Sequence, residues 1–337
     1  MLQMNNQSRF APVIHLLADH DGVDTIFVVA RATFALAAQP AFLPAQRPPV
    51  AGDEYWGAPN ASSLKYASEV HVGKVGTDVV LVGSAHAPAS RPVGEMLVAL
   101  EVAGRAKVLR VFGDRAWTSS SRWGRGGDGF TKPRPFVTMP LVYERAFGGP
   151  SLDRNPVGRG SRAPRASRQV EGDALPNLED PRWPLRQFGD GPPPAGFGFV
   201  APSWLPRRGY AGTYDADWKQ TRAPFLPRDY DRRFSNAASA DLVFERPLQG
   251  AEPVQLDGVS AEGRVRLALP TVRPRVAIRI AGGWQRPPAI LETVLIEPDQ
   301  SRFSLSFRAK LRCDKRALRI ETITIEEEGG PCPARFS

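Results

Sequence analysis

Hydrophobic and polar residues alternate with a period of two along several short stretches of the chain. The segment FSLSF at 303–307 places Phe303, Leu305 and Phe307 on one side and two serines on the other. Because successive side chains of a β-strand point to opposite faces of a sheet, this alternation predicts a half-buried strand. The segments RVRLAL at 264–269 and RVAIRI at 275–280 alternate in the same way.

Further apolar segments, punctuated by Gly and Pro, are also typical of strands. They are TIFVVARATFAL at 25–36, DVVLVGSAHA at 78–87, MLVALEV at 96–102, KVLRVFG at 107–113 and IETITIE at 320–326. A turn at Gly104 joins the third of these to the fourth. The spacing predicts a mainly β fold, with antiparallel sheets arranged as a sandwich or a barrel-like structure.

The middle of the chain has a different composition. Residues 131–240 hold 16 of the 33 prolines, and four of the seven tryptophans lie between 120 and 240. Because disordered segments are poor in aromatic residues, we expect these loops to be ordered. The sequence therefore predicts a single domain over 1–337, with a long Pro/Gly/Trp-rich loop segment at 120–240 between two β-rich parts.

The charge balance is positive, with 44 Lys and Arg against 35 Asp and Glu, a formal net charge of +9. Five arginines follow one another without an intervening acid: Arg154, Arg159, Arg162, Arg165 and Arg168. A run of this kind is usually a solvated loop, and its alternative role is to meet an acidic partner such as a protein, an anionic lipid or a nucleic acid.

The location of the protein is indicated by what the sequence lacks. Cys313 and Cys332 are its only cysteines, so no disulfide framework is implied and a reducing compartment fits. The first residues do not form a secretory signal, and no apolar run reaches about 18 residues. We expect a cytoplasmic protein without membrane insertion.

Two pairs of acids suggest chemistry, Asp215 with Asp217 and Asp229 with Asp231. Such pairs can bind a divalent cation or share the work of glycoside hydrolysis. Aspartates also cap helices and turns, and Asp231 precedes two arginines, so a structural role is the favoured interpretation.

Other candidate chemistry is absent from the sequence. The four histidines are not spaced as metal ligands, and no nucleophile elbow or phosphate-binding loop is present. The sequence therefore predicts no catalytic residue, no metal site and no cofactor.

The aromatic loops suggest binding instead. Trp204, Tyr214 and Trp218 belong to residue types that anchor interfaces, because they bury a large rigid area and still form hydrogen bonds. The alternative is that such rings cover the core beneath long loops. Phe197 lies between two glycines, and we expect it to be buried.

A series of short segments resembles one family. They are VVARATFAL, KVGTDVVLVGSAHAP, KVLRVFGDRAW, PFVTMPLVYERAFGG, NPVGRG, LPNLEDP, PAGFGFVAPSW, GTYDADW and DYDRRFSNAA. They occur in the order seen in domain of unknown function 2169, and the resemblance spans about residues 25–310. Within it, MPLVYERAFGG at 139–149 would be a strand that leads into the ordered loops.

The resemblance implies a function in type VI secretion. It implies a cytoplasmic, non-enzymatic adaptor or chaperone whose partners are a secreted effector and a protein of the spike tip. On that basis we expect the five arginines, Trp204, Tyr214 and Trp218 to bind the partner. Two alternatives remain open: a carbohydrate-active enzyme that uses the paired aspartates, and a nucleic-acid binder that uses the arginine run, which no recognised nucleic-acid motif supports.

Overall fold

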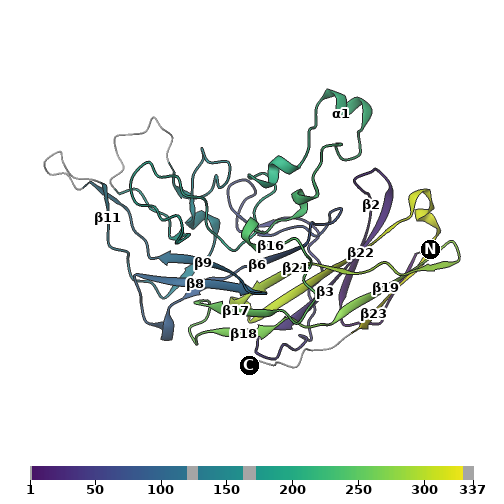
Figure 1. Ribbon diagram of the computed structural model, residues 1–337, viewed down its shortest axis with the longest axis horizontal. Coiled ribbons are helices and arrows are strands. Elements are labelled where there is room, and N and C mark those ends of the chain that lie inside the picture. The colour runs from purple at the N-terminus through teal and green to yellow at the C-terminus, as the bar shows by residue number, and fades with distance from the viewer. Residues whose placement is uncertain (1, 120–127, 162–171, 329–337) are drawn as a thin grey trace.

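The computed structural model describes residues 2–119, 128–161 and 172–328, and three sheets form its framework (Figure 1). The largest has six strands. In order across the sheet they are β16 (Val243–Phe244), β6 (Thr77–Leu81), β21 (Ile290–Glu297), β22 (Arg302–Arg312), β3 (Asp24–Ala35) and β2 (Ala11–Ala18).

Two smaller sheets accompany it. The five-stranded sheet has the order β15 (Leu178–Glu179), β9 (Arg105–Phe112), β8 (Glu95–Val102), β17 (Pro253–Asp257) and β18 (Val265–Ala268). The four-stranded sheet has the order β1 (Gln3–Asn6), β23 (Ile320–Glu328), β19 (Arg273–Ile280) and β20 (Gly283–Gln285). Neighbouring strands are mostly antiparallel, and β6–β21 and β1–β23 are parallel.

The remaining elements are short. Four two-residue or three-residue strand pairs are β4 (Glu54–Tyr55) with β5 (Leu64–Tyr66), β7 (Ser84–His86) with β12 (Thr138–Pro140), β10 (Trp117–Ser119) with β11 (Asp128–Phe130), and β13 (Phe147–Gly148) with β14 (Arg159–Gly160). The α-helix is α1 (Ala216–Thr221), and the 3-10 turns are η1 (Pro88–Ser90), η2 (Tyr143–Arg145), η3 (Arg207–Tyr210), η4 (Arg232–Ser235), η5 (Ala240–Leu242), η6 (Pro298–Gln300) and η7 (Asp314–Arg319). The predicted mainly β, sandwich-like class is confirmed, and no sheet of the described residues closes into a barrel.

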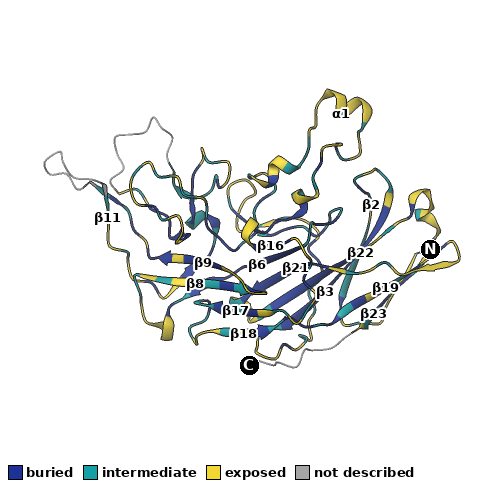
Figure 2. Cartoon of the chain, viewed as in Figure 1, coloured by how far each residue is buried: buried dark blue, intermediate teal, exposed yellow. Residues whose placement is uncertain are grey.

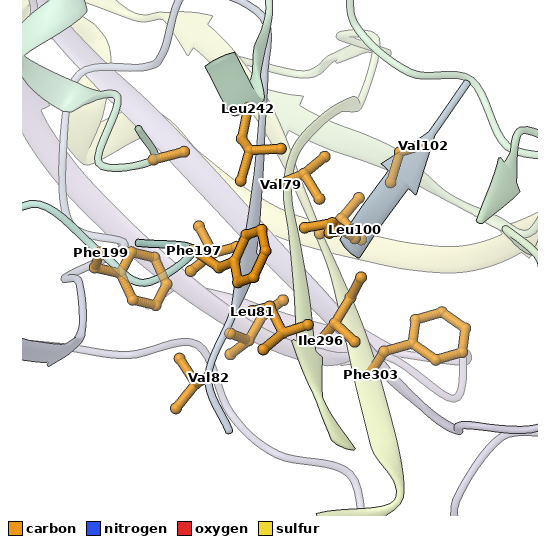
Figure 3. Close-up of a cluster of buried hydrophobic side chains, with 14 of the residues drawn as sticks. Val79, Leu81, Val82, Leu100, Val102, Phe197, Phe199, Leu242, Ile296 and Phe303 are labelled. Atoms are coloured by element: carbon orange, nitrogen blue, oxygen red, sulfur yellow. The ribbon is translucent and has the colours of Figure 1, made fainter. Parts of the chain in front are cut away.

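One face of the six-stranded sheet is apolar and packs against both smaller sheets. Along β3, Ile26 and Val28 lie in a cluster with the four-stranded sheet, whereas Phe34 lies in the main core with the five-stranded sheet. Because these residues are two, or a multiple of two, positions apart, they point from the same face of the strand. Figure 3 shows part of the main core, where Leu81 and Ile296 of the large sheet lie close to Leu100 of β8.

The opposite face of the same sheet is polar and yet buried. It carries Asp78, Glu292, Arg31 and Arg308 from four adjacent strands, all less than a tenth exposed. The segment 43–76 covers this face, so that Arg31 Nη1 donates to the Pro48 carbonyl and Arg308 Nη2 to the Glu69 carbonyl. The dark central strands of Figure 2 therefore hold charges as well as hydrocarbon.

This cover corrects one expectation for FSLSF. The alternation predicts a half-buried strand with exposed serines, but Ser304 and Ser306 are as buried as Phe303 and Phe307. Ser304 Oγ lies 3.2 Å from Thr33 Oγ1, which satisfies both hydroxyls. The strand is therefore central with both faces covered, and the serines belong to its polar, loop-covered face.

The described parts of the loop-rich segment stand over the sheets as ordered turns (Figure 1). Phe197 is fully buried, as expected. The predicted strand at 139–149 is instead two short strands, β12 and β13, separated by η2. Glu144 in that turn accepts hydrogen bonds from the backbone and hydroxyl of Ser63, which ties the segment down.

One part of this segment projects as an arm that ends in α1, and it is mostly exposed (Figure 2). The arm, residues 211–230, contacts the turn between β2 and β3. Arg222 Nη2 donates to the His20 carbonyl, and the ring of Phe225 lies against Gly22. The arm is therefore held to the β2–β3 turn by residues that directly follow α1.

Candidate binding cleft

A cleft of about 660 Å³ lies where the loop-rich segment meets the sheets. Lys107 of β9 and Tyr143 of η2 line it from the scaffold side. The turns η3, η4 and η5 contribute Arg207, Arg233 and Asp241. A volume of this size suits a small molecule or a few residues of a partner chain.

Arg207 is a buried cation in the wall of this cleft. The residue is 8% exposed, and it donates from Nε to the Phe234 carbonyl at 2.7 Å and from Nη1 to the Val200 carbonyl at 2.8 Å. Burial lowers the pKa of its guanidinium. In the described part of the chain no carboxylate lies within 4.0 Å of it, so backbone carbonyls supply its hydrogen bonds, while Asp53 and Asp78 favour its charge from farther away.

The neighbouring charges of the cleft are paired with one another. The Arg182 guanidinium donates to Asp180 from both Nε and Nη2, with Nη2 at 2.6 Å from Oδ2, and its Nη2 lies 3.2 Å from Asp241. Lys107 Nζ lies 3.5 Å from Asp241 and donates to Ser239. Burial lowers the pKa of Lys107, although the nearby Asp241 opposes the shift. These four charges largely cancel.

The rim of the cleft is partly apolar. Trp183 is 59% exposed, and Pro193 and Pro194 also line the cleft. Arg233 lies with its guanidinium 4.3 Å from the ring centre of Tyr210, another lining residue. An exposed ring beside fixed charges offers a flat apolar contact next to polar groups, which is the composition of interface anchors.

The five arginines that we expected to bind a partner do not share one environment. Arg154 is exposed and lines the cleft. Arg159 is half-buried and donates from Nε to the Glu144 carbonyl at 2.9 Å, and burial lowers its pKa. Arg162, Arg165 and Arg168 lie outside the described residues.

Trp204 is not a surface anchor, so this part of the expectation is wrong. Its side chain is 3% exposed and meets the ring of Tyr143 edge to face, with ring centres 5.6 Å apart. The ring belongs to the main core, where it supports the cleft from below. Packing a large apolar ring into the core removes it from water, which is more favourable than exposing it on the surface.

Tyr214 and Trp218 lie on the arm and do not line the cleft. Tyr214 is 54% exposed and Trp218 is half-buried, and their rings meet with centres 4.7 Å apart. Trp218 Nε1 donates to the Phe225 carbonyl at 2.9 Å, which closes the arm on itself. The two rings therefore form a fixed aromatic pair on a projecting element.

Three of the four paired aspartates have structural roles, as favoured. Asp215 caps α1 by accepting from the Trp218 N–H at 2.9 Å, and Asp231 caps η4 and binds Arg233. Asp229 accepts from the N–H and hydroxyl of Thr213, which lowers its pKa. Asp217 lies in the first turn of α1.

The described residues hold no group of three or more His, Cys, Asp or Glu side chains arranged to bind a metal ion. Across 2–119, 128–161 and 172–328, no helix has the length and apolar content that a membrane span needs.

The sequence did not single out the main residues of the cleft. Arg207 and Arg208 are adjacent, yet Arg208 is exposed and pairs with Asp153, whereas Arg207 is buried. Trp183 lies in a Pro-rich segment and is the most exposed described tryptophan, but nothing in its local sequence separates it from Trp204. Only tertiary packing distinguishes these pairs.

Fold and site together define a class: a mainly β, sandwich-like protein whose central loops form a charged and aromatic cleft. A family model described as an uncharacterized protein conserved in bacteria, domain of unknown function 2169, matches residues 21–308. The chain belongs to this family. No curated protein and no solved structure matches it significantly.

Proposed function

We propose that this chain is a non-enzymatic, cytoplasmic adaptor or chaperone that binds a type VI secretion effector and helps to load it onto the spike. The role is the one that the resemblance of its sequence segments implies. The observation that carries it is the combination of Arg207, which has no carboxylate within 4.0 Å in the described chain, and the exposed Trp183, both of which line the same cleft.

The scaffold supports the proposal because it holds these groups rigidly. The cleft is built on turns whose backbone is anchored to the large sheet, for example through Asn236, which donates to Asp78 at 2.8 Å. Binding residues on loops that a rigid framework positions lose little conformational entropy when a partner docks. The aromatic pair on the arm offers a second contact for a protein partner.

The alternatives draw less support. Three of the four aspartates that a carbohydrate-active enzyme would use, Asp215, Asp229 and Asp231, are engaged in caps, in a turn and in an ion pair. The arginine run that a nucleic-acid binder would use contributes Arg154 to a cleft that also holds three acids, Asp180, Asp241 and Glu245. Phosphate backbones favour continuous positive surfaces instead.

The test is affinity purification from the native bacterium with a tagged chain, followed by mass spectrometry. We expect a secreted effector and a spike-tip protein to co-purify. A variant with Tyr214→Ser and Trp218→Ser serves as a comparison, because both changes lie on the exposed arm and leave the core intact. Purification of the chain without any component of the secretion machinery would contradict the proposal.

A further inference from the structure

We propose that the cleft recognises an extended acidic segment of the partner protein, with one Asp or Glu carboxylate bound by Arg207 and an apolar side chain or proline packed on Trp183. The proposal deepens the proposed function, since it rests on the partner being a protein. It specifies the groups of the partner that the cleft binds, a side-chain carboxylate and an apolar side chain or proline.

The Arg207 guanidinium is held in a fixed orientation that leaves one nitrogen able to bind an anion. Nε and Nη1 are occupied by the carbonyls of Phe234 and Val200, which fixes the plane of the guanidinium. Nη2 has no hydrogen-bond partner among the described residues, and it is not one of their fully buried unsatisfied atoms. Nη2 is therefore the nitrogen left to donate to a ligand.

The charge of the cleft favours a carboxylate. Its described acids include Asp180 and Asp241, which are already bound by Arg182 and Lys107. Arg207 and Arg154 have no ion-pair partner in the described chain, and the one further acid of the lining is Glu245, so the cations remain in excess. A buried guanidinium gains most from a ligand that carries a negative charge, because the hydrogen bond is then charge-assisted.

The rim favours an extended chain as the carrier of that carboxylate. Trp183, Pro193 and Pro194 all line the cleft, which opens between turns rather than closing over its contents. Grooves lined by an aromatic ring bind extended, proline-containing segments because these lose little entropy on docking. The occupant we commit to is therefore a stretch of polypeptide, and a free small-molecule carboxylate is an outcome of the test.

The experiment selects peptides from a random 12-residue display library on the full chain. Selected peptides are then synthesised with both ends blocked, so that any negative charge lies on side chains. We expect enrichment of Asp or Glu, and a loss of affinity of roughly tenfold or more when the recurring acid is changed to its amide, since the acceptor of the hydrogen bond then loses its negative charge.

Variants locate the binding. Arg207→Met should weaken the selected peptides by roughly tenfold or more, whereas Arg208→Met, next to it but outside the cleft lining, should leave affinity unchanged. Because Arg207 also holds two backbone carbonyls, Trp183→Ala and Arg154→Glu are measured as well. Both residues are exposed, so their replacement tests the cleft without disturbing the fold, and each should weaken binding.

Three results would overturn the proposal. The first is equal binding of the acidic peptides and their amide versions. The second is affinity that none of the cleft variants changes. The third is failure to select any peptide while free glutamate binds in the cleft, which would assign it to a small-molecule carboxylate. The peptides need no natural partner, so an acidic motif found here stands even if purification from cells retrieves no effector.

Discussion

At the scale of single residues, the buried charges beneath the segment 43–76 have the largest expected effect on stability. Lys74 Nζ donates to Asp78 at 2.7 Å and to the Thr293 hydroxyl at 2.8 Å, and both charged side chains are at most 3% exposed. Asp78 also accepts from Asn236 and from the Ala237 N–H. A pair so completely enclosed adds little net stability when intact, but it is costly to break.

We therefore expect Asp78→Ala to lower the free energy of unfolding by roughly 3–5 kcal/mol, because Lys74 keeps its charge and loses its partner. Urea denaturation followed by circular dichroism measures this difference. Glu321→Gln is the control, since it removes an ion pair with Arg279 in which both side chains are nearly half exposed. Equal effects of the two substitutions would contradict the role given to Asp78.

The histidine of the same region predicts a dependence on pH. Burial, followed by the charges of Arg308 and Lys74, holds the pKa of His71 well below 6.5. Arg308 Nη2 lies 3.0 Å from His71 Nε2, so a proton on that nitrogen would place two cations in contact. The folded state thus keeps His71 neutral at a pH where the unfolded chain takes up a proton.

Stability should consequently fall as the pH drops below about 6.5, by at most about 1.4 kcal/mol per pH unit for this group. The sign follows because the unfolded state binds more protons in this window. His15, whose pKa burial also lowers, contributes in the same direction. We expect His71→Gln to flatten the curve of unfolding free energy between pH 7 and pH 5.5, whatever its effect at pH 7. An unchanged slope would show that His71 titrates normally in the folded protein.

At the scale of elements, the hairpin β8–β9 is the clearest case of local sequence determining structure. Its two turn residues, Ala103 and Gly104, have φ values of 51° and 78°. Two positive values at the centre of a two-residue turn define a type I′ turn, for which Asn-Gly is preferred. Alanine is strained in this conformation, whereas asparagine tolerates it.

Ala103→Asn should therefore raise the free energy of unfolding by about 0.5–1 kcal/mol. Thermal denaturation would show it as a higher midpoint. Gly104→Ala is the matched change in the opposite direction, because a Cβ there meets no neighbouring atom and only the backbone conformation is strained. If both substitutions acted in the same direction, the turn type would not be the cause.

Elements of this kind are what the sequence could predict. The alternation in 275–280 and 303–307 identified β19 and β22 because the period of a strand is a local property. The burial of Ser304 and Ser306 was missed because their cover comes from residues more than 200 positions away in the chain. The cleft was missed for the same reason, since Arg207 and Arg208 differ only in what the folded chain places around them.

At the scale of the whole molecule, the positions of charge and aromatic groups predict how a protein partner would bind. Arg154 is exposed at the cleft, and Tyr214 and Trp218 form a pair on the arm. Exposed charges act over a distance and weaken with salt, whereas packed rings act only after contact. If the partner is the proposed effector, we expect higher ionic strength to slow association with it and to leave dissociation nearly unchanged.

Trp218→Ala should do the reverse and speed dissociation, by roughly tenfold or more if the ring is an anchor worth about 2 kcal/mol. Surface-immobilised kinetics at low and high salt, with the effector found by purification, measures both rates. Trp204→Ala serves as the contrast, because loss of this core ring should lower stability instead. A Trp218 variant with the parent's dissociation rate would remove the arm from the interface.

The pairing of β1 with β23 also determines how the molecule responds to tension. The two strands run parallel, from Gln3 beside Thr322 to Asn6 beside Ile325. Force applied at residue 3 and at residue 328 would draw these strands past each other lengthwise, so that their hydrogen bonds carry the load together. In an antiparallel hairpin pulled at its ends, the bonds open one after another under a small force. The short parallel contact should therefore resist tension between these two ends of the chain. The first rupture under load should occur in shear, between β1 and β23.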